Sequence, residues 1–174
     1  MILIAAISFI GTEQTFAASG AELDREVDSA LATLLAKSAS AKVLAEKAKA
    51  ILVFPAITKA GFIVGGQYGQ GALRENGKTV GYYSSVAASY GLQAGIQKFG
   101  YALFLMTDSA RQYIDRSDGW EIGVGPSIVV VDVGAAGSLT TTTAKSEIYA
   151  FFFSQKGLMA GIGLQGTKIT RINK

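Results

Sequence analysis

The sequence has no cysteine, no histidine and only two prolines among its 174 residues. These absences exclude thiol nucleophiles, disulfide bridges, thiolate or imidazole metal sites, and the side chain that ordinarily titrates near neutral pH. A serine nucleophile would need a lysine or a carboxylate as its base, because no histidine is present to activate it. Most familiar catalytic centres are therefore excluded, and we expect no cofactor.

Charge is also scarce, because charged residues make up 17% of the chain, against roughly 25% in a typical soluble domain. Hydrophobic residues make up 49%, and glycine occurs 21 times, about twice its usual share of about 7%. A chain of this length and composition can bury one sizeable core, which predicts a single domain. The glycine content disfavours an all-helical bundle.

The charges are distributed unevenly along the chain. Residues 22–28 carry four acidic residues and one arginine, whereas the chain from Ser29 onward has 15 basic and eight acidic residues. A basic body suits an anionic partner such as phospholipid, nucleic acid or an acidic protein, although it also serves plain solubility. We expect no nucleic-acid partner, because Lys98 beside Phe99 and the isolated Lys156 do not form a basic face with interleaved aromatic residues.

The amino-terminal residues differ from the rest of the chain. Met1–Ile10 contains one polar residue, Ser8, and small residues follow at positions 15–18. This pattern is typical of a secretory signal peptide, whereas a membrane-spanning helix needs about 20 apolar residues. We therefore expect residues 1–18 to be a signal peptide, residues 19–174 to form the domain, and the protein to be exported to the periplasm or cell envelope.

Two helices are expected after the signal peptide. Ser19 and Glu22 have the spacing of a capping box. An apolar stripe follows at helical spacing, formed by Leu23, Val27, Leu31, Leu34 and Leu35. This pattern predicts a helix over residues 21–37. Residues 38–40 interrupt the pattern, and a short basic helix is expected over residues 41–50.

From Gly61 onward the apolar period falls to two, and 19 of the 21 glycines occur there. One expected strand places on a single face Val80, Tyr82, Ser84, Val86, Ala88 and Tyr90. Residues 158–165 alternate in the same way, turns are expected at residues 76–77 and 118–119, and a helix is expected over 107–116. The predicted fold class is α+β, with N-terminal helices packed on a glycine-rich, mostly antiparallel, barrel-like sheet.

Three patterns resemble ligand sites without completing them. Residues 161–166 read G-x-G-x-x-G, but only eight residues follow, too few for the helix that would hold a pyrophosphate. Residues 71–79 (GALRENGKT) have one residue too many between their glycines for a phosphate loop, so we expect a hairpin. Residues 115–119 lack the distal glutamate of a calcium loop, and a surface turn is expected there.

Two acidic residues lie beside or within apolar strands, Asp132 and Glu147. A buried carboxylate at such a position can have a raised pKa and act as an acid or base. It can equally be a hydrogen-bonded structural acid or stand at the end of a strand. Both interpretations remain open at the level of the sequence.

Several ordered blocks of the sequence resemble the SYLF domain, also called the Ysc84 actin-binding domain. The opening blocks are AKAILVFP at 48–55, TKAGF at 58–62 and GGQYG at 65–69. The later blocks are GWE at 119–121, VDVGA at 131–135 and GLMAGIGLQGTKI at 157–169. The resemblance covers residues 21–173. It departs from the family pattern at Gln165, where family members usually have glutamate.

The resemblance implies a lipid-binding module and no enzyme. Eukaryotic members of the family bind phosphoinositides, and some bind or bundle actin, whereas bacterial members are typically exported. Because the chain begins like an exported bacterial protein, the expected partner is anionic phospholipid or a membrane surface. A structural or adaptor module that binds another envelope protein is the alternative.

The candidate lipid-binding residues are four lysines: Lys42, Lys47, Lys49 and Lys59. A lysine near an anionic membrane contributes about 1 kcal/mol to binding. The first half of the helix at residues 21–37 is acidic, so we expect that helix to pack on the sheet. The second helix and a turn at residues 58–59 would then contact headgroups. The alternative is that these lysines simply solvate one face of a helix.

Overall fold

The computed structural model describes residues 19–116, 118–131, 133, 145–156 and 163–174. In chain order its elements are α1 (Gly20–Lys37), α2 (Ala39–Ala45), β1 (Ala50–Glu75), β2 (Lys78–Leu105), α3 (Asp108–Tyr113), β3 (Trp120–Glu121), β4 (Ile128–Val131), β5 (Ile148–Lys156) and β6 (Lys168–Ile172). The expected signal peptide, Asp132 and most of the strand expected at 158–165 lie outside the described residues.

Capping serines define the helices at the amino end. The hydroxyl of Ser19 accepts a hydrogen bond from the Glu22 amide at 3.2 Å, which confirms the expected start of α1. Ser38 closes α1 by donating its amide to the Leu34 carbonyl, and its hydroxyl accepts from the Ala41 amide to open α2. The expectation of a helix reaching residue 50 is wrong, because α2 ends at Ala45.

The strands form one curled, mixed sheet, which confirms the predicted fold class. Its six described strands run in the order β3-β6-β2-β5-β4, and β1 pairs with β2 off this path. All pairs are antiparallel except β4 with β5. The long hairpin of β1 and β2 is the centre of the sheet, with Asn76 and Gly77 at its tight turn in the positive-φ conformation (49° and 76°).

The sheet begins at Ala50, about ten residues earlier than the change of period at Gly61 suggested. The first five residues of β1, AILVF, are all buried. A strand covered on both faces is a continuous apolar run without alternation, so its sequence cannot be distinguished from a buried helix. The tertiary packing therefore decides the conformation of this segment.

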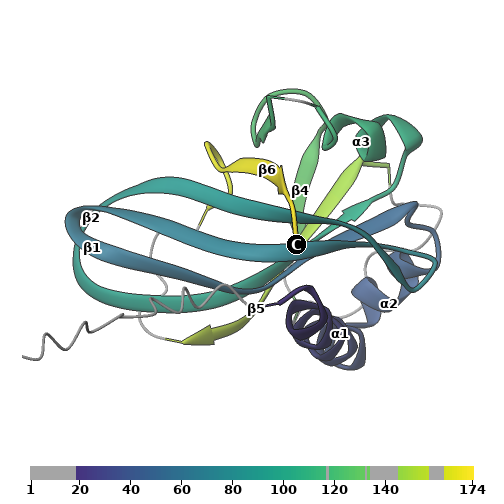
Figure 1. Ribbon diagram of the computed structural model, residues 1–174, viewed down its shortest axis with the longest axis horizontal. Coiled ribbons are helices and arrows are strands. Elements are labelled where there is room, and N and C mark those ends of the chain that lie inside the picture. The colour runs from purple at the N-terminus through teal and green to yellow at the C-terminus, as the bar shows by residue number, and fades with distance from the viewer. Residues whose placement is uncertain (1–18, 117, 132, 134–144, 157–162) are drawn as a thin grey trace, which may run out of the picture.

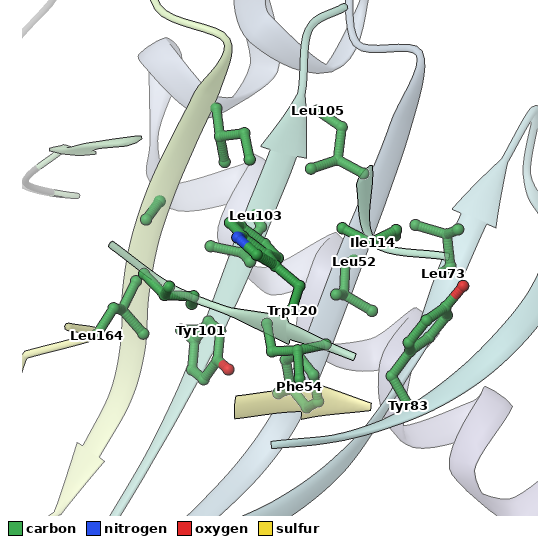
Figure 2. Close-up of a cluster of buried hydrophobic side chains, with 14 of the residues drawn as sticks. Leu52, Phe54, Leu73, Tyr83, Tyr101, Leu103, Leu105, Ile114, Trp120 and Leu164 are labelled. Carbon is green, nitrogen blue, oxygen red and sulfur yellow. The ribbon is translucent and has the colours of Figure 1, made fainter. Parts of the chain in front are cut away.

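Two hydrophobic clusters lie on opposite sides of the curled sheet. The inner cluster includes Phe54, Leu103 and Tyr83 from the hairpin, and Trp120 closes it with its indole N–H donating to the Val124 carbonyl at 2.9 Å. Figure 2 shows these side chains converging from different strands. The outer cluster lies beneath α1 and α2, which contribute buried residues such as Leu34 to it. This packing confirms that the first helix lies on the sheet.

The hairpin of β1 and β2 folds back on itself, and this fold-back lies at the left of Figure 1, away from α1 and α2. The fold-back has two arms, residues 50–60 and residues 65–75 of β1 with their partners on β2. Glycines allow these two arms to approach closely. A Cβ on Gly65 would lie 2.2 Å from the Ala60 carbonyl oxygen, and one on Gly71 would lie 2.3 Å from the Val53 carbonyl oxygen. Gly61, at the bend, has a φ of 146°. The glycine-rich block at 65–71 therefore serves the packing of one half of the hairpin against the other.

The two ends of the described fold lie side by side at Tyr82. A Cβ on Gly20, at the start of α1, would lie 2.9 Å from the Tyr82 hydroxyl oxygen and 3.6 Å from the Cβ of Lys174. Tyr82 pairs with Ile172 in the register of β2 and β6. The last strand thus closes the sheet next to the first helix.

Candidate functional site

Three of the four candidate lysines lie at the helical end of the molecule. Lys42 lies on α2, and Lys47 and Lys49 lie in the short connection from α2 to β1. All three are exposed. The opposite side of α2 is buried through Ser40, Ala41 and Leu44, which fixes the face that carries Lys42 to solvent.

Lys49 has an acidic neighbour. Its ammonium nitrogen lies 3.8 Å from a carboxylate oxygen of Asp108, at the start of α3. The two side chains are 51% and 76% exposed, so the pair contributes little to stability. Lys49 is therefore a weaker candidate for a phosphate contact than Lys42 or Lys47.

Lys59 lies apart from the other three lysines. It is in the middle of β1, nine residues beyond Ala50, and is the register partner of Gln97. Nine residues of extended strand span roughly 30 Å. The expected turn at residues 58–59 is strand in the structure, so that expectation is wrong. The structure brings together Lys42, Lys47 and Lys49 but does not bring Lys59 to them.

The acidic half of α1 is partly engaged by the hairpin. The Asp24 carboxylate accepts hydrogen bonds from the hydroxyls of Thr79 at 2.7 Å and Tyr82 at 3.0 Å. Asp28 forms an ion pair with Arg74. These contacts turn two of the four acidic residues of residues 22–28 toward the sheet, where they hold α1 in place.

The remaining acidic residues of α1 are far from the basic end. Glu22 and Glu26 are exposed in its first two turns, whereas Lys37 is exposed at its last residue. A helix rises about 1.5 Å per residue, so Glu22 and Lys37 are roughly 22 Å apart, more than twice the screening length of about 8 Å at physiological salt. From Lys37 to Lys49 the sequence has four lysines and one acidic residue, Glu46. Lys37 is not among the four candidate lysines, although its place in the last turn of α1, next to α2, puts it in the same basic run.

A denser cluster of charges has a structural role. The Asp115 carboxylate accepts hydrogen bonds from the Tyr83 hydroxyl and from Arg111 and Arg171, and Arg111 also pairs with Glu75. Burial acts to raise the pKa of Asp115, but the hydrogen bonds from Tyr83 and Arg111 and the two guanidinium charges outweigh it and lower that pKa. The turn after Asp115 is therefore tied to the sheet by ion pairs, which supports the expectation of a turn over a calcium loop.

The other ligand-like patterns also have structural explanations. Residues 71–79 are the tight hairpin between β1 and β2, as expected. Gly166 is followed by strand β6, which confirms that no dinucleotide-binding helix follows it. Glu147 precedes β5, and its carboxylate accepts the Ser127 amide at 3.0 Å, which favours the structural interpretation. Within the described residues no group of acidic side chains could hold a metal ion, and none of the helices is long and apolar enough to cross a membrane.

The part of the chain from Val86, in the first third of β2, to the last residue identifies the family. A sequence model of the family described as "Ysc84: Las17-binding protein actin regulator" matches residues 86–174, just over half of the chain. The chain belongs to the Ysc84 family. The Ysc84 match confirms the resemblance in the later sequence blocks, whereas the opening blocks at 48–69 and the candidate lysines lie before the matched region. No curated protein matches the chain.

Ysc84-family membership classifies the chain as a binding module. The matched region contains most of β2, α3 and strands β3 to β6, so it supplies the inner cluster with Trp120 and Tyr101. The Ysc84-matched part cannot complete the sheet without β1, because β1 pairs with β2 along the whole hairpin.

Proposed function

We propose that this Ysc84-family chain is a non-catalytic module that binds anionic phospholipid at the bacterial cell envelope. Family membership supports a binding role. The lipid class is inferred from the charge of the exposed surface at the helical end, which has four lysines from Lys37 to Lys49. Such a basic surface is attracted electrostatically to anionic phosphate headgroups, and it needs no preformed pocket.

The separation of charge along α1 is the observation that carries this proposal. An acidic amphipathic helix beside the lysines would repel an anionic bilayer. Asp24 and Asp28 instead contact the hairpin, and Glu22 lies more than two screening lengths from Lys37. Lys42 and Lys47 can therefore approach phosphate groups while α1 stays packed on the sheet.

Vesicle flotation tests the proposal. We expect the chain to float with anionic vesicles and to bind neutral vesicles much more weakly, with added salt reducing the anionic binding. Reversal of Lys42 and Lys47 to glutamate should weaken binding to anionic vesicles about tenfold or more, since each lysine contributes about 1 kcal/mol. A chain that begins at Ser19 controls for adhesion by the apolar segment Met1–Ile10.

A second double variant controls for net charge. Lys78 and Lys145 are exposed on other parts of the molecule, so Lys78→Glu with Lys145→Glu changes the net charge equally. This control should bind much more tightly than the Lys42→Glu, Lys47→Glu variant. Equal weakening by both pairs would show a general charge effect and would contradict a binding site at α2. Absence of binding by the unaltered chain would contradict the lipid function itself.

A protein-binding adaptor is the alternative function. The family description names a protein partner, and Val129 and Val130 on β4 are exposed at 42% and 57%. A stoichiometric complex from envelope extract that persists at high salt, together with absent vesicle binding, would favour this function. Salt-sensitive vesicle binding without such a complex would favour the lipid function.

Export is a separate part of the proposal. It rests on the apolar segment Met1–Ile10 and the small residues at 15–18. Amino-terminal sequencing of the protein from its natural host should show cleavage after Ala17 or Ala18. An intact Met1 on that material would contradict export by this route.

A further inference from the structure

The face of β2 that carries α1 and α2 continues beyond the helices as an open surface. Ala102 and Phe104 on this face belong to the outer cluster beneath the helices. The strand alternates without interruption from residue 96 to residue 105, so Lys98 and Ile96 lie on the same face. Both side chains are exposed, Ile96 by 68%. The helices therefore cover one end of this face and leave the other end open.

The other arm of β2 faces the opposite way. The Tyr101 hydroxyl donates a hydrogen bond to the Ser85 hydroxyl at 2.7 Å, and both residues are fully buried. The two arms of β2 thus point their odd-numbered side chains toward each other. Lys98 and Val86 alternate with these residues, so they point out of the molecule in opposite directions. We call the surface on the side of Lys98 the helical face: the exposed side chains of residues 29–45 together with Thr58, Ile96 and Lys98.

The chain segments that build the helical face contain no acidic residue. Residues 29–45, 50–73, 79–107 and 148–156 have no aspartate or glutamate, and the exposed lysines Lys37, Lys42 and Lys98 lie within them. The opposite surface differs, because its Lys168, the register partner of Val86, also pairs with Glu121 of β3. The helical face is therefore the surface that suits an extended anionic partner.

The row of residues at Lys98 requires an anion from outside the chain. The register partners of Lys98 are Thr58 on β1 and Lys156 on β5. Lysines at directly opposite positions of an antiparallel pair destabilise a sheet. A bulge in β5 between residues 153 and 156 creates this register, and Ser154 within the bulge has a φ of 52°. With no acidic residue on the neighbouring stretches of these strands, an external anion can balance the charge.

The sheet bends at the same level. A second irregularity lies on β1 between Phe54 and Ile57, so both strands that flank β2 are bulged beside Gly100. Bulges bend a strand and increase its twist. In Figure 1 the end of β5 reaches the lower side of the molecule, and α1 lies on that side too. One flat surface can therefore meet the helices and the row at Lys98 together.

We propose that the helical face lies flat on an anionic bilayer, with Lys98 as a second phosphate contact separate from α2. The inference rests on the proposed lipid function and adds the orientation of the molecule. The Lys49 amide donates to the Leu105 carbonyl, and Lys98 lies roughly 23 Å along the strand from Leu105. This distance exceeds the screening length of about 8 Å, so the two contacts engage different headgroups and together fix the orientation. Ile96 adds an apolar side chain beside Lys98, a combination suited to the membrane interface.

Single labelled cysteines test the orientation, because the natural chain contains none. The full chain with Thr58→Cys carries a fluorophore beside Lys98, and Val86→Cys carries it on the opposite surface; both positions are exposed. The probe is an anionic phospholipid vesicle in which some lipids carry a nitroxide quencher on the headgroup. We expect strong quenching at position 58 and much weaker quenching at position 86. Equal quenching, or stronger quenching at position 86, would overturn the proposal.

Two single substitutions test the contribution of Lys98. Lys98→Gln should weaken binding to anionic vesicles about fivefold at low salt, because a lysine near the surface contributes about 1 kcal/mol. Lys168→Gln removes the same charge from an exposed position on the opposite surface and should change binding less than twofold, by roughly the net-charge effect alone. Thermal unfolding verifies that both variants fold.

The outcomes separate the orientation from the lipid function. Binding that is unchanged by Lys98→Gln but weakened by reversal of Lys42 and Lys47 overturns the flat contact and leaves lipid binding at α2 in place. Equal weakening by Lys98→Gln and Lys168→Gln shows a general charge effect and also overturns the contact at Lys98. Absence of binding by the unaltered chain overturns both the orientation and the lipid function.

Discussion

Strands β1 and β2 pass through two environments that follow different rules. Near Leu52 and Leu103 both faces of the hairpin are covered, by the inner cluster on one side and by α1 and α2 on the other. Near Gly65 the two arms lie against each other, buried glutamines point inward, and Val64 and Ile96 are exposed. The helices convert one half of a continuous hairpin into a core, while the other half remains available for contact.

In the two halves of the hairpin, the covering helices and the glycines have the same role, because each brings one layer of the structure into contact with another. At the helical end, large side chains fill the space between layers. At the fold-back, missing side chains bring the layers together, as at Gly69, where a Cβ would lie 2.5 Å from the Ala56 carbonyl oxygen. The helical half should therefore lose stability when a large buried side chain is shortened. The fold-back should lose stability when a side chain is added at one of its glycines.

Truncation of a buried ring should have the largest effect on stability. Phe104 is fully buried beneath the helices, and its ring meets Phe151 edge-on at 5.1 Å between centroids. Phe104→Ala should lower the free energy of unfolding by about 3–5 kcal/mol. Tyr68→Ala, at a side chain of the fold-back that is 51% exposed, should cost less than about 1 kcal/mol. Urea denaturation measures both, and equal losses would break the distinction between the two halves.

Addition of a side chain at the fold-back should have the next largest effect. A Cβ on Gly71 would meet the Val53 carbonyl oxygen and the Phe54 ring, so Gly71→Val should destabilise the fold by about 3 kcal/mol. A Cβ on Gly66, on the outward face, would lie 3.7 Å from its nearest neighbour, the Ala87 carbonyl oxygen. Gly66→Val should change stability by less than about 1 kcal/mol, since valine suits strands. The comparison fails if the two variants unfold at the same urea concentration.

Loss of the Asp115 carboxylate should have a smaller, pH-dependent effect. Asp115→Asn should cost about 1–2 kcal/mol at neutral pH, because it weakens the hydrogen bond with Tyr83 and the pairs with Arg111 and Arg171. Since the pKa of Asp115 is lowered on folding, its contribution is fully present above the unfolded value of about 3.9 and is lost as pH falls through the folded pKa.

Unfolding curves over a pH series test this assignment. The difference in stability between the natural chain and Asp115→Asn should shrink as the pH falls from about 5 toward 2. A difference that stays constant with pH would show that the carboxylate charge does not contribute. The effect concerns the junction of α3 with the sheet and should leave the fold-back unaffected.

Local chemistry made several elements predictable from the sequence. The hydroxyls of Ser19 and Thr107 each accept a hydrogen bond from the amide three residues later, and so start α1 and α3. The starts of those two helices were therefore predictable within a few residues. Asn76 and Gly77 predicted the hairpin for a similar reason, since few other residue pairs suit positive φ at both positions. Each of these signals depends on residues that are neighbours in the chain.

The remainder depends on contacts between distant residues. A register shift between Phe54 and Ile57 places Leu52, Phe54 and Ile57 in the same cluster, so alternation is broken within the strand. Alternation at Val80–Tyr90 identified two faces but could not show that Val86 is outside and Ser85 inside. Three of the candidate lysines are exposed on α2 or in the connection after it, and only the extended path of β1 reveals that Lys59 is far from them.

Gly20 and Lys174, the first helical residue and the last residue of the chain, lie next to each other at Tyr82. A short linker could join these two residues, and the chain could be reopened between Asn76 and Gly77 at the exposed turn. In such a circular permutant β1 and β2 would no longer be adjacent in sequence and would have to find each other as distant segments. Its folding rate would reveal whether formation of that turn sets the pace of assembly.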